Sequence, residues 1–276
     1  MRRMLTCANM FAMGRPKTIA EWVEAQQASG RYIFTREDAE AGLGGSKVAV
    51  QTALRRLKQK GRIASPRRGF YVVVPPEYRA AGCLPASWFI DDLMRHLGLH
   101  YYVGVLSAAA LHGSGHQQPM MFQVIADRAT RPMQAGRVRI EVHTSRTVNA
   151  MPVTRVETET GTMVVATPET AAFDVVRFFS AAGHWNNVAM VLSELAEKID
   201  RDRLVDIAPH VHLPDVQRLG YLLSIVGEGE LAEPLASWLA GRRTTIVRLR
   251  TDLPKGDADL DPRWRLFPNE LVDIDL

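Results

Sequence analysis

Hydrophobic residues recur at helical spacing near the start of the chain. Between residues 19 and 28, Trp22 falls on the apolar side of such a pattern, and Thr18 is suited to cap the helix that follows. A second short helix is predicted from Thr35 to about residue 41. Thr35 and Asp38 have the spacing of a capping box, with Asp in place of the usual Glu or Gln. A glycine-rich turn, residues 42–45, leads into a third helical pattern.

The third pattern covers residues 47–60 and is the most amphipathic. One stripe is apolar and consists of Val50, Ala53, Leu54 and Leu57. At about 100° per residue, the other side presents Val48, Thr52, Arg55, Arg56 and Gln59. We therefore expect a helix that packs by one side and offers polar and cationic side chains on the other.

A short hairpin is predicted directly after this helix. Residues 63–65 form one arm, Pro66 to Gly69 turn the chain, and residues 70–74 return. Gly69 can supply a positive φ at the corner, which would leave Arg67 and Arg68 at the tip. Helix, glycine turn, helix and hairpin follow one another in the order of a winged helix-turn-helix.

Short strand patterns and then long helical ones follow. We predict strands at residues 101–103, 121–126, 138–144, 153–157 and 162–165, and helices at 88–97 and 106–111. Thr167 and Pro168 are suited to open a helical region that continues to about residue 238. Two late strands are expected at 245–249 and 263–267. Strands followed by helices indicate an α+β body.

The charge of the chain is divided unevenly. Residues 1–80 hold 15 Lys and Arg against 6 Asp and Glu, a net charge of +9, whereas residues 81–276 hold 19 against 24, a net charge of −5. A basic end on a mildly acidic body favours an anionic partner at that end. Two cysteines, Cys7 and Cys83, are too few for a disulfide framework or a cysteine zinc site, which favours the reducing cytoplasm.

These patterns predict the domain organisation. The fold class is α+β, with an N-terminal winged helix-turn-helix and a larger mixed α/β C-terminal domain. We expect a flexible lead at residues 1–16, the DNA-binding domain at 17–75, a linker at 76–84 and the C-terminal domain at 85–276. The lead contains four possible translation starts: Met1, Met4, Met10 and Met13. We find no signal peptide and no apolar run long enough to span a membrane.

Nine residues are predicted to contact duplex DNA if the third helix enters the major groove. Gln51 and Arg55 are expected to read base edges, because an amide suits adenine and a guanidinium suits guanine. Ser46, Lys47 and Thr52 are expected to hold phosphates near the start of that helix. Four arginines would add backbone contacts: Arg56, Arg62, Arg67 and Arg68.

Catalytic patterns are weak. Asp127 followed by Glu141 and His143 only faintly resembles the Asp…Glu-x-Lys arrangement of metal-dependent nucleases, and the Lys position is a histidine. His112 and His116 lie close in sequence but have no cysteine near them to complete a zinc site. We also find no nucleophile elbow and no phosphate-cradling loop. We therefore expect neither an enzyme nor a bound cofactor or metal.

Six longer segments carry a further signal: residues 69–78, 88–94, 101–113, 116–119, 122–124 and 167–174. They resemble the AbiEi-type antitoxins of abortive-infection, type IV toxin–antitoxin systems. The resemblance extends from about Lys17 to Phe179. It implies an N-terminal winged helix-turn-helix that binds inverted repeats in its own promoter and represses its operon. It further implies a C-terminal domain associated with antitoxicity toward a nucleotidyltransferase-like toxin.

Two alternatives remain open at the level of sequence. The C-terminal domain could neutralise a toxin by direct contact or by an indirect route, and either is compatible with DNA binding. The chain could instead be a small-molecule-responsive winged-helix regulator without a toxin partner. In that case we would expect an apolar pocket with a few inward polar groups within residues 100–170.

Overall fold

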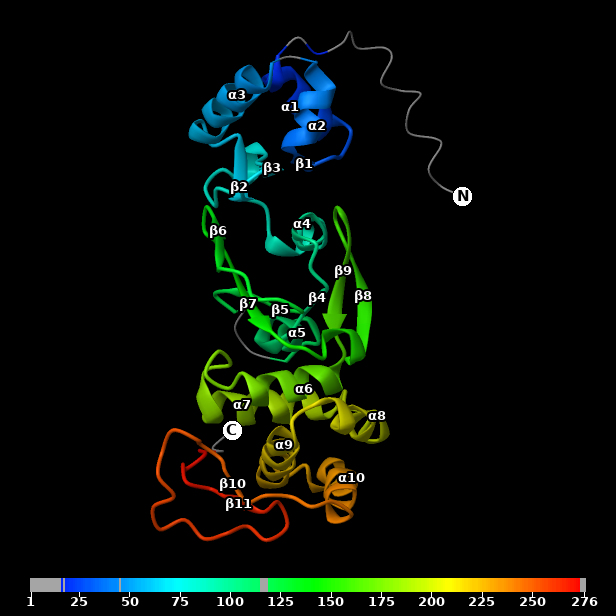
Figure 1. Ribbon diagram of the computed structural model, residues 1–276, viewed down its shortest axis with the longest axis vertical. Helices are drawn as coiled ribbons and strands as arrows, with labels where there is room; N and C mark the ends of the chain where they lie inside the picture. The colour runs from blue at the N-terminus through cyan, green and yellow to red at the C-terminus, as the bar shows by residue number, and fades with distance from the viewer. Residues whose placement is uncertain (1–15, 17, 45, 115–118, 274–276) are drawn as a thin grey trace. The chain divides into compact units, whose positions relative to one another are not determined.

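The computed structural model describes residues 16, 18–44, 46–114 and 119–273 (Figure 1). Apart from Pro16, the predicted flexible lead with its possible start methionines lies outside these residues, as do Cys7, Gly45 and His116. The described chain divides into two compact units. The first comprises the described residues up to Leu97 together with Met133–Arg139 and Thr158–Gly161, and the second comprises the rest.

The first unit begins with the elements of a winged helix-turn-helix. These are α1 (Ile19–Ala28), β1 (Ile33–Thr35), α2 (Arg36–Leu43), α3 (Lys47–Gln59), β2 (Ile63–Arg67) and β3 (Phe70–Val73). The strands form an antiparallel sheet in the order β1-β3-β2, with Ile33 opposite Val72 and Ile63 opposite Val73. The predicted order of elements is confirmed, and β1 is an addition that the sequence pattern did not predict.

Side-chain caps start all three helices at the predicted positions. The Thr18 hydroxyl accepts the Glu21 amide at 3.2 Å, and the Ser46 hydroxyl accepts the Ala49 amide at 3.2 Å. At the start of α2, the Thr35 amide donates to the Asp38 carboxylate at 2.7 Å and the Asp38 amide donates to the Thr35 hydroxyl at 3.2 Å. The capping box is therefore present with Asp in the third helical position.

A small hydrophobic core joins these elements. The Trp22 and Phe34 rings meet edge to face with centroids 5.1 Å apart. The stripe predicted on α3 supplies three buried residues to the same cluster: Val50, Leu54 and Leu57. Because that stripe is buried, the opposite side of α3 is left for solvent or a partner.

The first unit continues beyond the sheet. It adds two one-turn helices, η2 (Pro76–Tyr78) and η3 (Ala86–Trp88), and α4 (Ile90–Leu97). The predicted linker, residues 76–84, contains η2 and the buried residues Cys83 and Leu84. The domain limits drawn from the sequence remain predictions.

A six-stranded sheet has most of its residues in the second unit. Its strands are β4 (Tyr101–Val103), β5 (Phe122–Ala126), β6 (Met133–Ala135), β7 (Val138–Thr144), β8 (Val153–Thr158) and β9 (Gly161–Ala166), in the order β6-β7-β5-β4-β9-β8. The strand β6 and the start of β7 belong to the first unit. β4 runs antiparallel to β5 and parallel to β9, and β5 runs parallel to β7. The helix α5 (Val105–Leu111) and the turn η4 (Val148–Ala150) lie in the connections. Five of the six strands match predicted ones, and β6 was not predicted.

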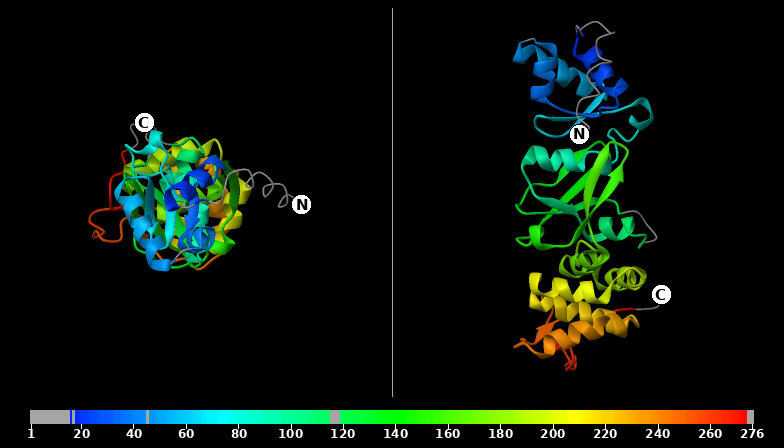
Figure 2. Two further views of the ribbon diagram at one scale, coloured as in Figure 1. Left: turned by 90° about the horizontal axis from the view of Figure 1, so that it is seen from above. Right: turned by 90° about the vertical axis from the view of Figure 1, so that its right-hand side faces the viewer.

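Helices follow the sheet, as the sequence indicated. They are α6 (Pro168–Arg177), α7 (His184–Ala196), α8 (Arg201–Ile207), η5 (Ala208–His210), α9 (Leu213–Ile225) and α10 (Gly229–Ala240). Thr167 caps α6 and Pro168 is its first residue, as predicted. Within this unit, α6 and α7 lie nearest the strands and α10 lies farther away (Figures 1 and 2). The α+β fold class is confirmed.

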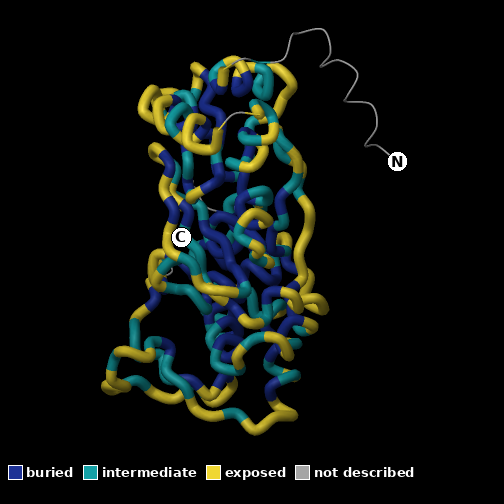
Figure 3. Tube along the Cα trace, turned by 45° about the horizontal axis from the view of Figure 1, so that its top comes forward, coloured by how far each residue is buried: buried dark blue, intermediate teal, exposed yellow. Residues whose placement is uncertain are grey.

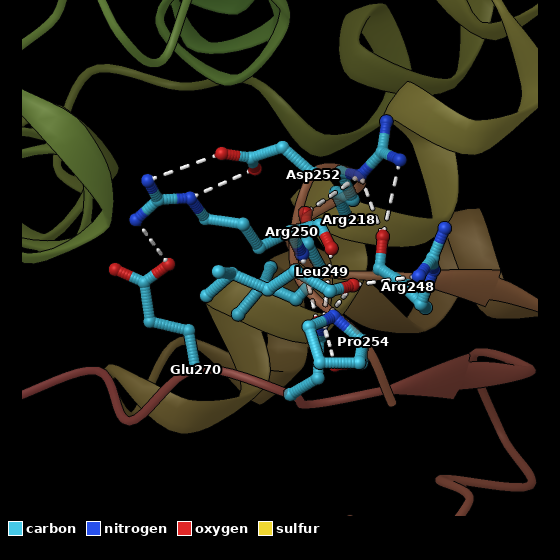
Figure 4. A network of polar contacts seen from close by, with 9 residues as sticks. Arg218, Arg248, Leu249, Arg250, Asp252, Pro254 and Glu270 are labelled. Carbon is cyan, nitrogen blue, oxygen red and sulfur yellow. Dashed lines mark hydrogen bonds and ion pairs between the residues drawn. The ribbon is translucent and has the colours of Figure 1, made fainter. Parts of the chain in front are cut away.

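The segment after α10 is mostly exposed or half-buried (Figure 3) and is fastened by polar contacts (Figure 4). Its two strands, β10 (Val247–Arg248) and β11 (Leu266–Phe267), pair in parallel and are shorter than predicted. Arg218 of α9 donates to the Arg248 carbonyl at 3.2 and 3.1 Å and to the Leu249 carbonyl at 3.1 Å. This arginine therefore holds the segment against the helices of the second unit.

Within the part of the chain that the structure describes, none of the helices has the length and apolar character needed to cross a membrane.

Candidate nucleic-acid interface

A groove of about 380 Å³ lies between α3 and the β2–β3 hairpin of the first unit. Its walls come from the start of α2, the outer side of α3, the hairpin and the hairpin turn. The lining residues are Arg36, Val48, Gln51, Thr52, Leu54, Arg55, Lys58, Ser65, Arg68, Gly69 and Tyr71. Four of the nine predicted DNA-contacting residues are thus brought together: Gln51, Thr52, Arg55 and Arg68.

The groove is cationic. Arg36, Arg55, Lys58 and Arg68 line it, and no aspartate or glutamate does. Among the described residues, none of these four cations forms an ion pair with a carboxylate. Four like charges without a counter-charge leave an excess positive potential there, which an anionic ligand would neutralise.

The outer side of α3 forms one wall with a continuous row of side chains. Val48, Gln51, Thr52 and Arg55 are spaced i, i+3, i+4 and i+7, so they follow one another along a single helix face. Val48 is 74% exposed, and Gln51 and Arg55 are exposed as well. An amide, a hydroxyl, a guanidinium and a methyl-bearing side chain thus all face the groove.

The hairpin turn differs from its prediction in one respect. Arg67 does not lie at the tip, because it pairs with Phe70 as the last residue of β2, and the turn itself is Arg68–Gly69. Gly69 adopts φ +83°, so the predicted positive φ is confirmed. The Gly69 carbonyl accepts the Arg36 amide at 2.9 Å, which ties the turn to the start of α2.

The remaining predicted contacts lie outside the groove. Ser46 caps α3, and Lys47 is exposed in its first turn, which contains no acidic residue. Arg56 is exposed but does not line the groove. Arg62 donates to Glu24 of α1 at 2.7 Å, so a contact from Arg62 to DNA would have to share or break this ion pair. The roles of all nine residues in binding remain predictions.

Two of the four cationic groove residues were not among the predicted contacts. Lys58 flanks the outer side of α3, and Arg36 is the first residue of α2. The Nε atom of Arg36 is buried without a hydrogen-bond partner in the described structure. A sequence signal for Arg36 did exist, because the helix dipole disfavours a cation at the first position of a helix.

The pattern of Asp127, Glu141 and His143 forms no metal site in the described part of the chain, and His116 of the other pattern lies outside that part. His143 lies 3.6 Å from Glu141 and stacks on Phe178 with ring centroids 4.7 Å apart. Burial lowers the pKa of His143, and the Glu141 charge opposes this shift. Over residues 16, 18–44, 46–114 and 119–273, no three His, Cys, Asp or Glu residues lie together in a way that could hold a metal ion.

Fold and groove together define a class of protein, the winged helix-turn-helix regulators, here with a larger C-terminal body. The overall likeness extends to a solved structure, described as the crystal structure of the RV2827C protein from Mycobacterium tuberculosis. The two chains share 19% sequence identity with a TM-score of 0.65, and the match covers 91% of each. At this identity the likeness concerns the fold alone. A comparison with curated proteins gave no match.

Two family profiles match separate parts of the chain. Residues 26–74 match the profile described as "Transcriptional regulator, AbiEi antitoxin", and residues 102–225 match "AbiEi antitoxin C-terminal domain". Together they cover more than half of the 276 residues. The chain belongs to the AbiEi antitoxin family, and it is a DNA-binding regulator of the antitoxin class.

Proposed function

We propose that this protein represses its own operon by binding inverted repeats in its promoter, and that it opposes a nucleotidyltransferase-like toxin. In this proposal α3 enters the major groove of the DNA. Gln51 and Arg55 read base edges, and the hairpin turn places Arg68 against the phosphate backbone.

One observation carries the DNA-binding part of this proposal. Four cations from α2, α3 and the hairpin turn converge on one groove that has no acidic lining residue. If α3 were only an amphipathic surface helix without a ligand, there would be no reason for cations from three elements to lie together. Its cations would instead be expected to pair with nearby carboxylates. Phosphates supply the missing counter-charge, and this electrostatic contribution dominates non-specific affinity for DNA.

Selection from a random duplex pool tests this part without knowledge of the operator. The full chain should enrich a sequence containing an inverted repeat, and that sequence should occur upstream of its own gene. A gel-shift titration at about 0.1–0.2 M salt, the range in which such contacts are strongly salt-dependent, should then show saturable binding. Absence of both enrichment and binding would refute the proposal.

The antitoxin part is supported by the match of residues 102–225 to the AbiEi antitoxin C-terminal domain. Growth of cells that express a cognate nucleotidyltransferase-like toxin tests it, with the antitoxin supplied from an independent promoter. We expect rescue by the full chain and equal rescue by Arg55→Ala, because Arg55 belongs to the DNA-binding groove. Failure of both to rescue would overturn the antitoxin role, and rescue by the unsubstituted chain alone would show that repression is required for it.

Co-purification of the two proteins then separates direct from indirect neutralisation. A stable complex would support contact between the C-terminal domain and the toxin. Rescue without any complex would support an indirect route.

A further inference from the structure

An apolar side chain lies exposed in the cationic groove. Val48 is 74% exposed. It is the most exposed of the large apolar side chains on the described helices and strands, ahead of Leu111 at 46% and Val153 at 43%. Single exposed apolar residues are common on protein surfaces. The position of Val48 sets it apart, because every other apolar lining residue of this groove is at least partly buried.

A valine is also an unfavourable choice for the exposed side of a helix. Its branched Cβ restricts χ1, which lowers helix propensity relative to Ala, Lys or Gln. Here it gains little from packing to offset that cost, because most of its surface remains in water. The same helix uses Val50 in the core, where the branched side chain is buried. Stability of the free protein therefore gives no reason for an apolar residue at position 48.

The chemistry of the DNA major groove does give a reason for an apolar residue at position 48. Among the four bases only thymine presents a methyl group in the major groove, and apolar side chains contact it there. Val48 precedes Gln51 by three residues on the same helix face, so their Cβ atoms lie on the order of 5–6 Å apart. Successive base pairs rise by about 3.4 Å. A base contacted by Val48 therefore falls within one or two base pairs of a base contacted by Gln51.

We propose that Val48 is a specificity-determining residue that contacts the 5-methyl group of a thymine, next to an adenine read by Gln51. The operator half-site then contains a thymine and an adenine at adjacent or nearly adjacent base pairs, both read from the major groove. This inference rests on the proposed function and adds the identity of two bases to it.

Replacement of thymine by deoxyuridine tests the contact, because it removes the methyl group and leaves base pairing unchanged. Duplexes from the random-pool selection, each with one thymine replaced, should reveal one position per half-site where the full chain binds about fourfold more weakly, the value of one buried methyl group. The Val48→Ala variant should bind the unmodified duplex more weakly and lose the difference between thymine and deoxyuridine at that position alone. Thymines outside the protected region serve as the internal control.

A second modified base identifies the adenine that Gln51 contacts. Replacement of adenine by 7-deazaadenine removes the N7 acceptor, and the affected adenine should lie within one or two base pairs of the sensitive thymine. The Gln51→Ala variant should no longer distinguish the two adenines. Gln59→Ala, exposed on the same helix but outside the groove, is the matched control and should behave as the unsubstituted protein does.

The possible outcomes separate this inference from the proposed function. If the chain enriches no DNA sequence, the proposed function fails first. If it binds a defined sequence with equal affinity whether thymine or deoxyuridine is present at every position, the Val48 contact is overturned and DNA binding stands. If Val48→Ala keeps the full difference between the two bases, another side chain reads the methyl group, and the assignment to Val48 is again overturned. Unchanged thermal unfolding of Val48→Ala would show that the fold is intact.

Discussion

The phenolic hydroxyl of Tyr102 donates to Oδ1 of Asp174 at 3.2 Å, between two side chains that are both buried in the second unit. Tyr102 lies on β4 and Asp174 on α6, so the bond joins the sheet to the first helix that follows it. Burial raises the pKa of Asp174 to about 8, although the Tyr102 hydroxyl and the Arg177 charge both act in the opposite direction. At neutral pH this carboxyl group is therefore largely protonated in the folded protein.

The Asp174 pKa predicts a pH dependence of stability with a defined sign. The unfolded carboxyl group ionises near its usual pKa of about 3.9, whereas the folded one keeps its proton until about pH 8. Between these values the unfolded state binds fewer protons, so the contribution of Asp174 to the free energy of unfolding falls as pH rises. Asp174→Asn should remove this contribution. Its stability relative to the unsubstituted protein should increase by at most about 1.4 kcal/mol per pH unit in that window.

Urea unfolding at several pH values between 4 and 8 measures this difference. The comparison between the two proteins cancels other titrating groups, including Asp215, whose pKa is also raised by burial. A constant difference across the window would show that Asp174 is ionised in the folded state.

Arg55 is expected to carry sequence preference. Replacement by alanine should weaken binding to the selected duplex by about 1–3 kcal/mol and relax preference at one base pair, because a bidentate contact to guanine is lost. Arg56→Ala is the matched comparison, since Arg56 is exposed on the same helix but does not line the groove. It should weaken binding to all duplexes similarly. Equal preference profiles for the two variants would contradict the orientation of α3 proposed here.

Arg68 is expected to contribute through phosphate contact alone. Arg68→Ala should lower affinity for every duplex and reduce the slope of log K against log salt by about 0.9 for the one contact removed. Arg79 is exposed in the same unit and lies outside the groove, which makes Arg79→Ala the control. Titrations at four or five salt concentrations suffice. An unchanged slope for Arg68→Ala would place the hairpin turn away from the DNA backbone.

The sequence predicted those parts of the first unit that depend on local chemistry. Thr18, Thr35 and Ser46 cap helices at the expected positions because a cap requires only a side chain and an amide two or three residues away. The buried stripe of α3 follows from the helical period alone. The groove was only partly predictable, because Arg36 reaches it through a tie between α2 and the hairpin turn that depends on tertiary structure.

Most of the features that the sequence did not predict depend on contacts between residues distant in the chain. The ion pair of Arg62 with Glu24 joins residues 38 positions apart, so no local pattern indicates it. The strand β6 has three residues, too few to show an alternating pattern. Just before the late strand β11, the position of Trp264 is set by a tertiary contact, since Gln217 of α9 donates to the Trp264 carbonyl at 2.9 Å.

Replacing Arg218 should lower the folding stability more than replacing any other charged residue of the second unit. It pairs with the buried Asp215 at 3.3 Å and also donates to two carbonyls of the C-terminal segment (Figure 4). Arg218→Leu would leave Asp215 buried without its partner, and such a loss costs about 3–5 kcal/mol. Denaturant unfolding measures this change. The double variant with Asp215→Asn should recover part of the stability, because no lone charge then stays buried.

A matched change at the surface provides the control for Arg218. Asp252 pairs with Arg250 at 2.9 Å on the same segment, but its side chain is 60% exposed. Solvent screens this pair, so Asp252→Asn should leave the unfolding curve nearly unchanged. If Arg218→Leu and Asp252→Asn lowered the folding stability by similar amounts, the buried Arg218–Asp215 pair would have no special role.

The hydrogen bond from the Arg36 amide to the Gly69 carbonyl has a consequence for how this domain tolerates change in length. It fixes the start of α2 to the hairpin turn, so that Arg36 and Arg68 are separated by backbone geometry rather than by the reach of their side chains. Inserting one residue into the turn would change the distance between these two arginines. Relatives with longer hairpins would then be expected to contact phosphates at a different spacing along the DNA, even where their recognition helices are identical.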